Sequence, residues 1–265
     1  NNGEYVLING NQIVMIFLNY LMTRNTELGT LTGNEYIVKT IVTTETIRTI
    51  AEAQHIKMYD CFTGFKWIAN VMRENEGKAR YLGGGEESYG FLAEDFVRDK
   101  DSVSAISLMA EIAAWAKDKG LNMTDMLIDI YMKYGFSREK GISLVRKGKS
   151  GAEEIIALMK QFRENPPKEI AGSPVVTVKD FQSLVETNVA TGETKKLDMP
   201  TTSNVLQYYT ADRTKVSVRP SGTEPKIKFY IEVHDTLASA DEYKATEARA
   251  DEKIGRIAKE FGITK

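Results

Sequence analysis

The spacing of apolar residues changes near residue 165 and divides the chain into two parts. In residues 11–165, apolar positions with helical spacing alternate with short β-branched runs, which predicts an α/β layered domain. In residues 166–265, apolar and polar residues mostly alternate with a period of two, as in half-buried strands. Because these strands are followed by a helix, the second part is predicted to be a smaller α+β domain. The segment 165–168 (NPPK) is the expected linker.

The same patterns give the approximate positions of the elements. Helices are expected at 13–22, 45–53, 102–119, 123–134 and 155–162, and strands at 36–42, 56–59 and 80–82. In the second part, strands are expected at 175–178, 205–209, 215–219 and 226–233, and a final helix at about 241–261. The 102–119 helix is expected to bury one side, formed by Ile106, Met109, Ala110, Ala113 and Ala114. The opening stretch NNGEYVLINGNQ is predicted to be a turn, a short strand and a turn; since no initiator Met precedes it, we expect a fragment.

Composition narrows the class of protein. The 265 residues suffice for two domains, and 42% hydrophobic with 27% charged residues is ordinary for a soluble globular protein. A net charge of −2 does not favour nucleic-acid binding, and the chain contains no apolar run of 18 residues, so no membrane contact is expected. The single cysteine, Cys61, excludes an internal disulfide framework and favours a cytoplasmic location.

The stretch from Arg219 to Tyr230, RPSGTEPKIKFY, predicts a phosphate-binding loop between two strands. Arg219 offers a bidentate guanidinium, Ser221 and Thr223 offer hydroxyls, and Gly222 permits a bend that turns backbone N–H groups inward. Lys226 and Lys228 share one strand face and add positive charge. Composition alone is equally compatible with an ordinary polar turn.

A second polar loop, GGGEESYGF, begins at Gly83 and directly follows the strand expected at 80–82. The carboxylate of Glu86 and the hydroxyl of Ser88 are groups that bind sugar hydroxyls. A loop after a strand is also where α/β sheets usually bind ligands. The simpler alternative is a flexible, glycine-rich surface turn with solvated acids.

A third stretch, TGFKWI, begins at Thr63, which is a plausible helix N-cap. Lys66 would lie in the first turn of that helix, where a cation opposes the helix dipole unless an anion is near. An exposed lysine without a function is the alternative interpretation.

Taken in order, these strings resemble one known family. The R-x-S-G-T-E-P string, the G-E-E-S-Y-G string and the T-G-x-K string resemble the phosphate loop, the sugar loop and a substrate lysine of the α-D-phosphohexomutases, the phosphoglucomutase/phosphomannomutase family. The resemblance implies that Glu86 and Ser88 bind the O3 and O4 hydroxyls of the sugar and that Lys66 reaches the substrate. It also implies that Arg219, Ser221, Gly222, Thr223 and Lys228 bind the substrate phosphate.

The resemblance covers essentially the whole chain and corresponds to the third and fourth of the family's four domains. It implies an α/β domain over residues 11–165 and a domain with a small antiparallel sheet and helices over 166–265. Residues 1–10 would be the tail of a preceding metal-binding domain. The family interconverts hexose 1-phosphates and 6-phosphates through a bisphosphorylated sugar, using a phosphoserine and Mg²⁺.

Neither the family's Ser-His-Asn-Pro loop nor its D-x-D-x-D metal loop occurs in this sequence. We therefore expect no catalytic residue and no metal site in the chain, which would hold the substrate. Mg²⁺ and an activator of the glucose 1,6-bisphosphate type are expected only for the full-length enzyme, and the chain's partners would be hexose phosphates and the N-terminal half of the same protein.

Two other functions stay open: a stand-alone, non-catalytic sugar-phosphate sensor, and a scaffolding domain whose loops no longer bind. Within the enzyme interpretation, the choice among glucose, mannose and pentose phosphates also stays open, because relatives of the phosphopentomutase type exist. The presence of Ser88 favours hexoses.

Overall fold

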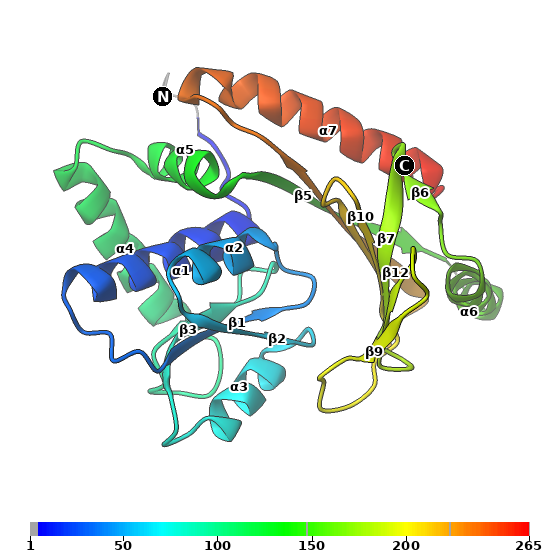
Figure 1. Ribbon diagram of the computed structural model, residues 1–265, viewed down its shortest axis with the longest axis horizontal. Helices are drawn as coiled ribbons and strands as arrows, with labels where there is room; N and C mark the ends of the chain where they lie inside the picture. The colour runs from blue at the N-terminus through cyan, green and yellow to red at the C-terminus, as the bar shows by residue number, and fades with distance from the viewer. Residues whose placement is uncertain (1–4, 147, 223, 265) are drawn as a thin grey trace. The chain divides into compact units, whose positions relative to one another are not determined.

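The computed structural model of the protein describes residues 5–146, 148–222 and 224–264, which form two compact units (Figure 1). The first unit runs to Phe136 and includes Leu237–Ala240; the second comprises Ser137–Thr236 and the residues from Asp241 onward. The boundary that the sequence suggested, after residue 165, is not where the structure divides the chain. The reason is that a strand before residue 165 pairs within the second sheet, and a helix before residue 165 packs on that sheet.

The first unit is built on a four-stranded sheet with the order β2-β1-β3-β4. Its strands are β1 (Glu35–Thr40), β2 (Lys57–Cys61), β3 (Arg80–Gly85) and β4 (Phe91–Ala93). Strands β1, β2 and β3 are parallel, and β4 is antiparallel to β3. Parallel neighbours need crossover connections, which here contain α2 (Thr46–Ala53) and α3 (Phe65–Glu74). The expected α/β layered unit is confirmed.

Helices cover both faces of this sheet (Figure 1). Helix α3 packs on one face through Phe65, Ile68 and Met72, which join Tyr36 and Tyr81 in one buried cluster. The other face is covered by α1 (Gly10–Glu27), with α2 beside it. The unit is completed by α4 (Ser102–Asp118) and α5 (Met123–Tyr134).

The three successive glycines belong to β3 and not to the loop that follows it, so the expected start of that loop at Gly83 was wrong. A Cβ at Gly85 would lie 2.6 Å from Val14 Cγ2, and one at Gly83 would lie 3.1 Å from Leu21 Cδ1, both on α1. A Cβ at Gly84 would lie 2.5 Å from the Val38 carbonyl oxygen. The glycines are needed because α1 and β1 approach this strand too closely for side chains.

The expected buried side of the 102–119 helix was also wrong. In α4 the buried residues are Ile112 and Ala116, whereas Ile106, Ala110 and Ala113 are exposed. The helix packs on its neighbours through a different side from the one that the periodicity indicated.

The second unit is built on an antiparallel sheet with the order β5-β12-β11-β10-β7-β8-β9, and a short strand, β6, also pairs with β7. Its strands are β5 (Phe136–Val145), β6 (Glu169–Ile170), β7 (Ser173–Asp180), β8 (Val185–Asn188), β9 (Thr194–Lys196), β10 (Leu206–Thr210), β11 (Lys215–Pro220) and β12 (Lys226–Asp235). The helices α6 (Gly148–Glu164) and α7 (Tyr243–Glu260) accompany it, with a short 3-10 turn at Ala240–Glu242. The expected α+β class with an antiparallel sheet is confirmed.

Strand β5 and the first part of α6 were missed by the sequence analysis. Polar and charged residues crowd β5, and Gly141 interrupts its apolar pattern. The strand can carry them because it lies at the edge of the sheet, beside β12. Helix α6 packs on β11 and β12 and therefore belongs to the same unit.

An aromatic cluster joins the helices to one face of this sheet. The ring of Phe162 on α6 lies 5.9 Å from that of Phe229 on β12, and Phe261 after α7 lies 6.0 Å from Phe229. The Tyr208 hydroxyl donates to the Phe162 carbonyl oxygen at 2.9 Å. The stripe of Ala250, Ile254 and Ile257 on α7 is buried as expected.

Two further local expectations in the first unit were wrong. Residues 5–9 form no strand, and residues 1–4 lie outside the described residues. The N-cap of α3 is Gly64, with a φ of 107°, and not Thr63, because the hydroxyl of Thr63 does not cap the helix. No helix in the described ranges is long and apolar enough to cross a membrane.

The packing of Gly84 predicts that Gly84→Ala lowers the free energy of unfolding of the first unit by about 1–3 kcal/mol through overpacking. Both tryptophans, Trp67 and Trp115, lie in this unit, so their fluorescence in a urea titration reports its unfolding. The control is Gly255→Ala on α7 of the second unit, where a Cβ meets open space, and it should leave the unfolding of the first unit unchanged. A Gly84→Ala chain as stable as wild type would contradict the close packing.

Asp212 is expected to contribute to the stability of the second unit in a way that depends on pH. Although partial burial opposes it, hydrogen bonds from Lys253 Nζ at 2.7 Å and Thr210 Oγ1 at 2.6 Å hold the pKa of Asp212 well below its ordinary value. Because the pKa of Asp212 is lower in the folded than in the unfolded chain, its ionised carboxylate stabilises the folded state at a pH above about 4, the pKa in the unfolded chain. This stabilisation is lost as the pH falls from about 4 through the lower pKa of the folded state.

We therefore expect Asp212→Asn to destabilise the second unit at pH 7, with a difference from wild type that shrinks progressively below about pH 4. Denaturation followed by circular dichroism at pH 7, 5 and 3 measures it, with Glu252→Gln on the exposed side of α7 as the control. An equal difference at all three pH values would refute this role of the carboxylate.

Candidate functional sites

The loop between β3 and β4 is a tight turn that contains Glu86 and Ser88. The Glu86 N–H donates to the Gly90 carbonyl oxygen at 2.8 Å, and the Tyr89 N–H donates to the Glu86 carbonyl oxygen at 3.2 Å. Tyr89 adopts a φ of 73°, which is uncommon for a residue with a side chain. Ser88 and Tyr89 are exposed, so the turn presents their side chains to solvent.

Glu86 is fixed in place by its neighbours. Its side chain belongs to a residue only 7% exposed, and Oε1 accepts the Gly64 N–H at 2.8 Å. A Cβ at Gly90 would lie 2.8 Å from Glu86 Oε2, so only glycine leaves room for the carboxylate in this position. Because a carboxylate has about four acceptor sites, Glu86 can hold α3 and still accept hydrogen bonds from a ligand.

The hydrogen bond between Glu86 and Gly64 places the TGFKWI segment (residues 63–68) next to this loop. Gly64 caps α3, and Lys66 is the second residue of that helix. Lys66 is exposed, and its Nζ lies 5.2 Å from the centroid of the Trp67 ring. The structure thus brings Glu86, Ser88 and the first turn of α3 together within the first unit.

The sequence analysis missed Gly10, the first residue of α1. A Cβ there would lie 2.0 Å from the Glu87 carbonyl oxygen and 2.9 Å from the Tyr89 nitrogen. The N-terminal end of α1 therefore packs against the backbone of the β3–β4 loop. The signal in the sequence was a glycine between Asn9 and Gln12, which form a capping box.

A buried ion cluster near the C-terminal ends of β1 and β2 was also missed. Lys39 is fully buried, and its Nζ lies 2.9 Å from both Glu45 Oε1 and Asp60 Oδ1. Arg48 pairs with the same two carboxylates. Two cations against two anions leave no net charge, so this cluster supports the strand ends rather than providing an anion site.

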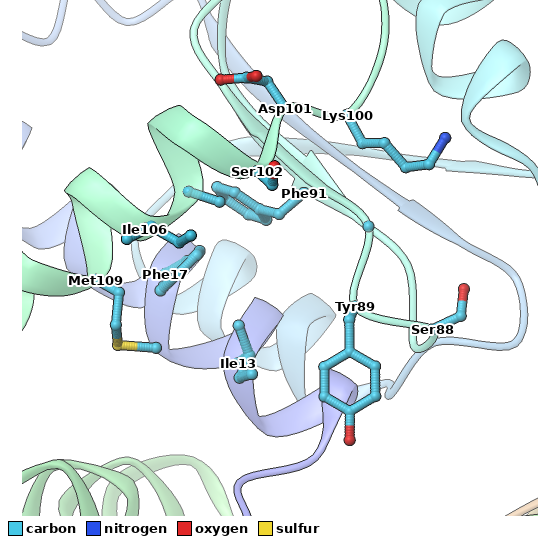
Figure 2. Close-up of a pocket in the computed structure, with 12 residues that line it drawn as sticks. Ile13, Phe17, Ser88, Tyr89, Phe91, Lys100, Asp101, Ser102, Ile106 and Met109 are labelled. Atoms are coloured by element: carbon cyan, nitrogen blue, oxygen red, sulfur yellow. The ribbon is translucent and has the colours of Figure 1, made fainter.

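A cavity of about 600 Å³ lies beside the β3–β4 loop (Figure 2). Figure 2 shows Ile13 and Phe17 of α1 and Ile106 and Met109 of α4 lining it, with Ser88 and Tyr89 at its edge. Lys100 also borders the cavity, and its Nζ lies 3.1 Å from Asp99 Oδ1. Asp101 and Ser102 add further polar groups to the lining, and the rest of the wall is apolar.

In the second unit, Arg219 and Lys228 stand directly opposite each other on β11 and β12. Cross-strand partners point to the same face of a sheet, so two cationic side chains share one face next to the loop. Arg219 Nη1 lies 3.5 Å from the Tyr230 hydroxyl. The long distance makes this a weak contact that leaves the guanidinium available.

The loop that follows Arg219 is closed by its own backbone. The Ser221 N–H donates to the Lys226 carbonyl oxygen at 2.7 Å, and the Glu224 N–H donates to Ser221 Oγ at 3.3 Å. The Arg146 N–H donates to the Pro225 carbonyl oxygen at 2.9 Å and ties the loop to the segment after β5. Lys226 Nζ lies 3.4 Å from Glu224 Oε2, so part of its charge is compensated.

Gly222 and Thr223 were also predicted to belong to the phosphate-binding loop. At Gly222, φ is not positive and a Cβ would meet open space, so the described backbone does not itself require glycine there, contrary to the sequence argument. Thr223 lies outside the described residues.

The polar face of the second sheet contains a buried network that the sequence analysis missed. Lys215 Nζ lies 2.8 Å from Glu232 Oε2, and His234 Nε2 lies 3.1 Å from Glu232 Oε1. Ser217 lies two residues after Lys215 on β11, and its Oγ accepts a hydrogen bond from Gln207 Nε2 on β10 at 2.8 Å. Period-two alternation could not reveal this, because it marks these positions as polar but not as buried.

Comparison with known proteins agrees with this geometry. Residues 9–134 match the phosphoglucomutase/phosphomannomutase alpha/beta/alpha domain III, and residues 158–250 match the phosphoglucomutase/phosphomannomutase C-terminal domain. The chain belongs to the phosphoglucomutase/phosphomannomutase family.

Among curated relatives, the phosphoglucomutase of Staphylococcus epidermidis is 34% identical over 229 residues, which are 86% of this chain and 41% of that protein. The phosphoglucomutase of Staphylococcus haemolyticus is 32% identical over 233 residues, 88% of this chain and 41% of that protein. The chain therefore spans about two fifths of the length of these relatives.

Solved structures show the same fold. Parafusin, a phosphoglucomutase from Paramecium, gives a TM-score of 0.62 at 16% identity, over 97% of this chain and 42% of that one. A phosphoglucomutase/phosphomannomutase family protein from Burkholderia thailandensis gives 0.55 at 17% identity, over 97% of this chain and 43% of that one.

No group of three or more His, Cys, Asp or Glu residues in the described part of the chain is placed to hold a metal ion. The clustered acids, such as Glu45 and Asp60, are paired with cations instead.

The position of Glu86 predicts that Glu86→Ala lowers the free energy of unfolding of the first unit by about 1–3 kcal/mol, because the Gly64 N–H loses its acceptor. Glu86→Gln keeps an acceptor oxygen at the same place and should lie close to wild type. Tryptophan fluorescence in a urea titration compares the two variants, and equal stability of Glu86→Ala and wild type would show that the carboxylate does not anchor α3.

Proposed function

We propose that this chain is the substrate-holding part of a phosphoglucomutase or phosphomannomutase. The full-length enzyme would interconvert hexose 1-phosphate and hexose 6-phosphate through a bisphosphorylated sugar. The observation that supports this most directly is the pair of preformed loops: Glu86 and Ser88 in one unit, and Arg219 opposite Lys228 in the other. Family membership supports the same assignment.

The first loop supplies groups that suit a sugar. The Glu86 carboxylate is anchored through Oε1, and its remaining acceptor capacity fits two neighbouring hydroxyls. Ser88, two residues further, adds a hydroxyl that both donates and accepts. Lys66, which lies in the turn of α3 that Glu86 holds, would add a positive charge for the substrate.

The second loop supplies groups that suit a phosphate dianion. Arg219 forms a planar fork, and Lys228 beside it adds a second charge. Ser221 and Thr223 would contribute hydroxyls. Since the described backbone leaves space beside Gly222, we propose that the phosphate approaches the chain there.

These groups hold the substrate but do not transfer a phosphoryl group. Transfer needs a donor, a charge-neutralising cation and a positioned acceptor. A grip on sugar hydroxyls and on the non-reacting phosphate can accept the bisphosphorylated intermediate in either orientation. We therefore assign the donor, Mg²⁺ and their ligands to a further part of the enzyme, of which residues 1–10 would form the end.

Two remaining assignments belong to this proposal. An activator of the glucose 1,6-bisphosphate type would bind to the same groups as the substrate. A cytoplasmic location suits the free, buried Cys61 and the phosphorylated substrates.

We expect Arg219→Ala to weaken the binding of glucose 6-phosphate and of glucose 1,6-bisphosphate by ~1.5–3 kcal/mol, the scale of hydrogen bonds to a charged group. Isothermal titration calorimetry with the full-length protein measures this. Arg256→Ala, on the exposed side of α7, removes the same charge away from the loop and should bind like wild type. Unchanged affinity for Arg219→Ala would contradict the phosphate-binding role.

A further inference from the structure

Helix α4 has an unusual composition for a helix with so much exposed surface. Between Ser102 and Ala116, Glu111 is the single charged residue, and its Oε1 accepts the Tyr20 hydroxyl at 2.7 Å. The other polar residues in this stretch are three serines, Ser102, Ser104 and Ser107. A helix that is mostly apolar is normally buried. Here, however, the buried residues of α4 are only Ile112 and Ala116.

Four exposed residues, Val103, Ile106, Ala110 and Ala113, follow one another at intervals of three, four and three residues. This spacing places them along one side of the helix, which we call the α4 face. Val103 is 73% exposed and Ile106 is 71% exposed. A stripe of this kind costs free energy in water and is typical of a surface that another protein segment covers.

The α4 face continues into the apolar cavity beside the sugar loop (Figure 2). Ile106 belongs to both, and the cavity reaches Ser88 and Tyr89 of the loop. Phe96, in the segment between β4 and α4, is also exposed. The unpartnered apolar surface therefore starts at the sugar loop and extends along α4.

We propose that the α4 face and this cavity form the docking surface for the part of the enzyme that precedes this chain and carries the phosphoryl donor. The inference rests on the proposed function. Curated relatives are more than twice as long as the matched region, since that region is 41% of their length. A segment that brings a donor to the sugar must also contact the surface next to the sugar loop.

The chemistry of the surface indicates what its partner presents. Because the four residues of the α4 face are uncharged, an apolar complementary surface fits them, and a charged or strongly polar one would lose hydration without compensation. Lys117, four residues after Ala113, lies on the same side and ends the apolar stripe. A second copy of this chain would also be apolar there, but it would occupy the space through which the donor has to approach.

Cysteine labelling tests the docking surface. The one native cysteine, Cys61, is buried, and burial raises the pKa of its thiol, so it should react slowly with a maleimide. Val103→Cys and Ile106→Cys place a thiol on the α4 face, and Glu52→Cys places one on the exposed side of α2 as a control. Each is made in the 265-residue chain and in the protein extended to its natural start codon.

In the extended protein, we expect both α4 thiols to react at least about tenfold more slowly than in the 265-residue chain, because covered thiols are inaccessible. The Glu52→Cys control should react at the same rate in both proteins. Equal rates at the α4 thiols would overturn the proposal. Protection that is seen in the 265-residue chain and increases with its concentration would overturn it too, because a second copy would then be the occupant.

Mutase activity of the extended wild-type protein, measured separately, distinguishes this inference from the proposed function. Protected α4 thiols in a protein without mutase activity would support docking and refute the proposed function. Mutase activity with unprotected thiols would support the proposed function and refute docking alone.

Discussion

The first unit depends on the close approach of α1 to β3. Gly83 and Gly85 leave no side chain on the strand face that α1 covers, so Val14 and its neighbours pack directly on the backbone. At its N-terminal end, α1 meets the β3–β4 loop at Gly10. Because one helix holds both the strand and the loop that follows it, the core of the unit places the loop, and hydrogen bonds within the loop and from Gly64 add to this.

The two loops that are proposed to bind the substrate are supported in different physical ways. In the first unit, Glu86 is held by one hydrogen bond from Gly64 and by the space that Gly90 leaves, so the carboxylate connects the loop to α3. In the second unit, Arg219 and Lys228 project from a sheet face whose inner polar residues are buried and paired, as Lys215 and Glu232 are. One loop is fixed by packing against its backbone and the other by a rigid ladder of strands.

Buried and exposed cations have different surroundings in this chain. Buried ions such as Lys39 are neutralised within the described part of the chain, and the cluster around it has no net charge to attract a ligand. The cations that the sequence analysis selected, Lys66 and Arg219, lie instead at exposed or half-exposed positions. This difference separates a cation that supports the fold from a cation that is open to a ligand, and only the surroundings of each residue reveal it.

The sequence by itself determined the classes of both units, most helices and strands, and the residue types of the two loops, because these depend on local periodicity and short ordered strings. It could not determine that Gly83 to Gly85 form part of a strand, that β5 joins the second sheet and α6 packs on it, or that Ile106 is exposed on α4. Each of these depends on which surfaces meet. Periodicity shows that a residue is apolar, but tertiary packing decides whether another element covers it, since burial is a property of contacts between distant segments.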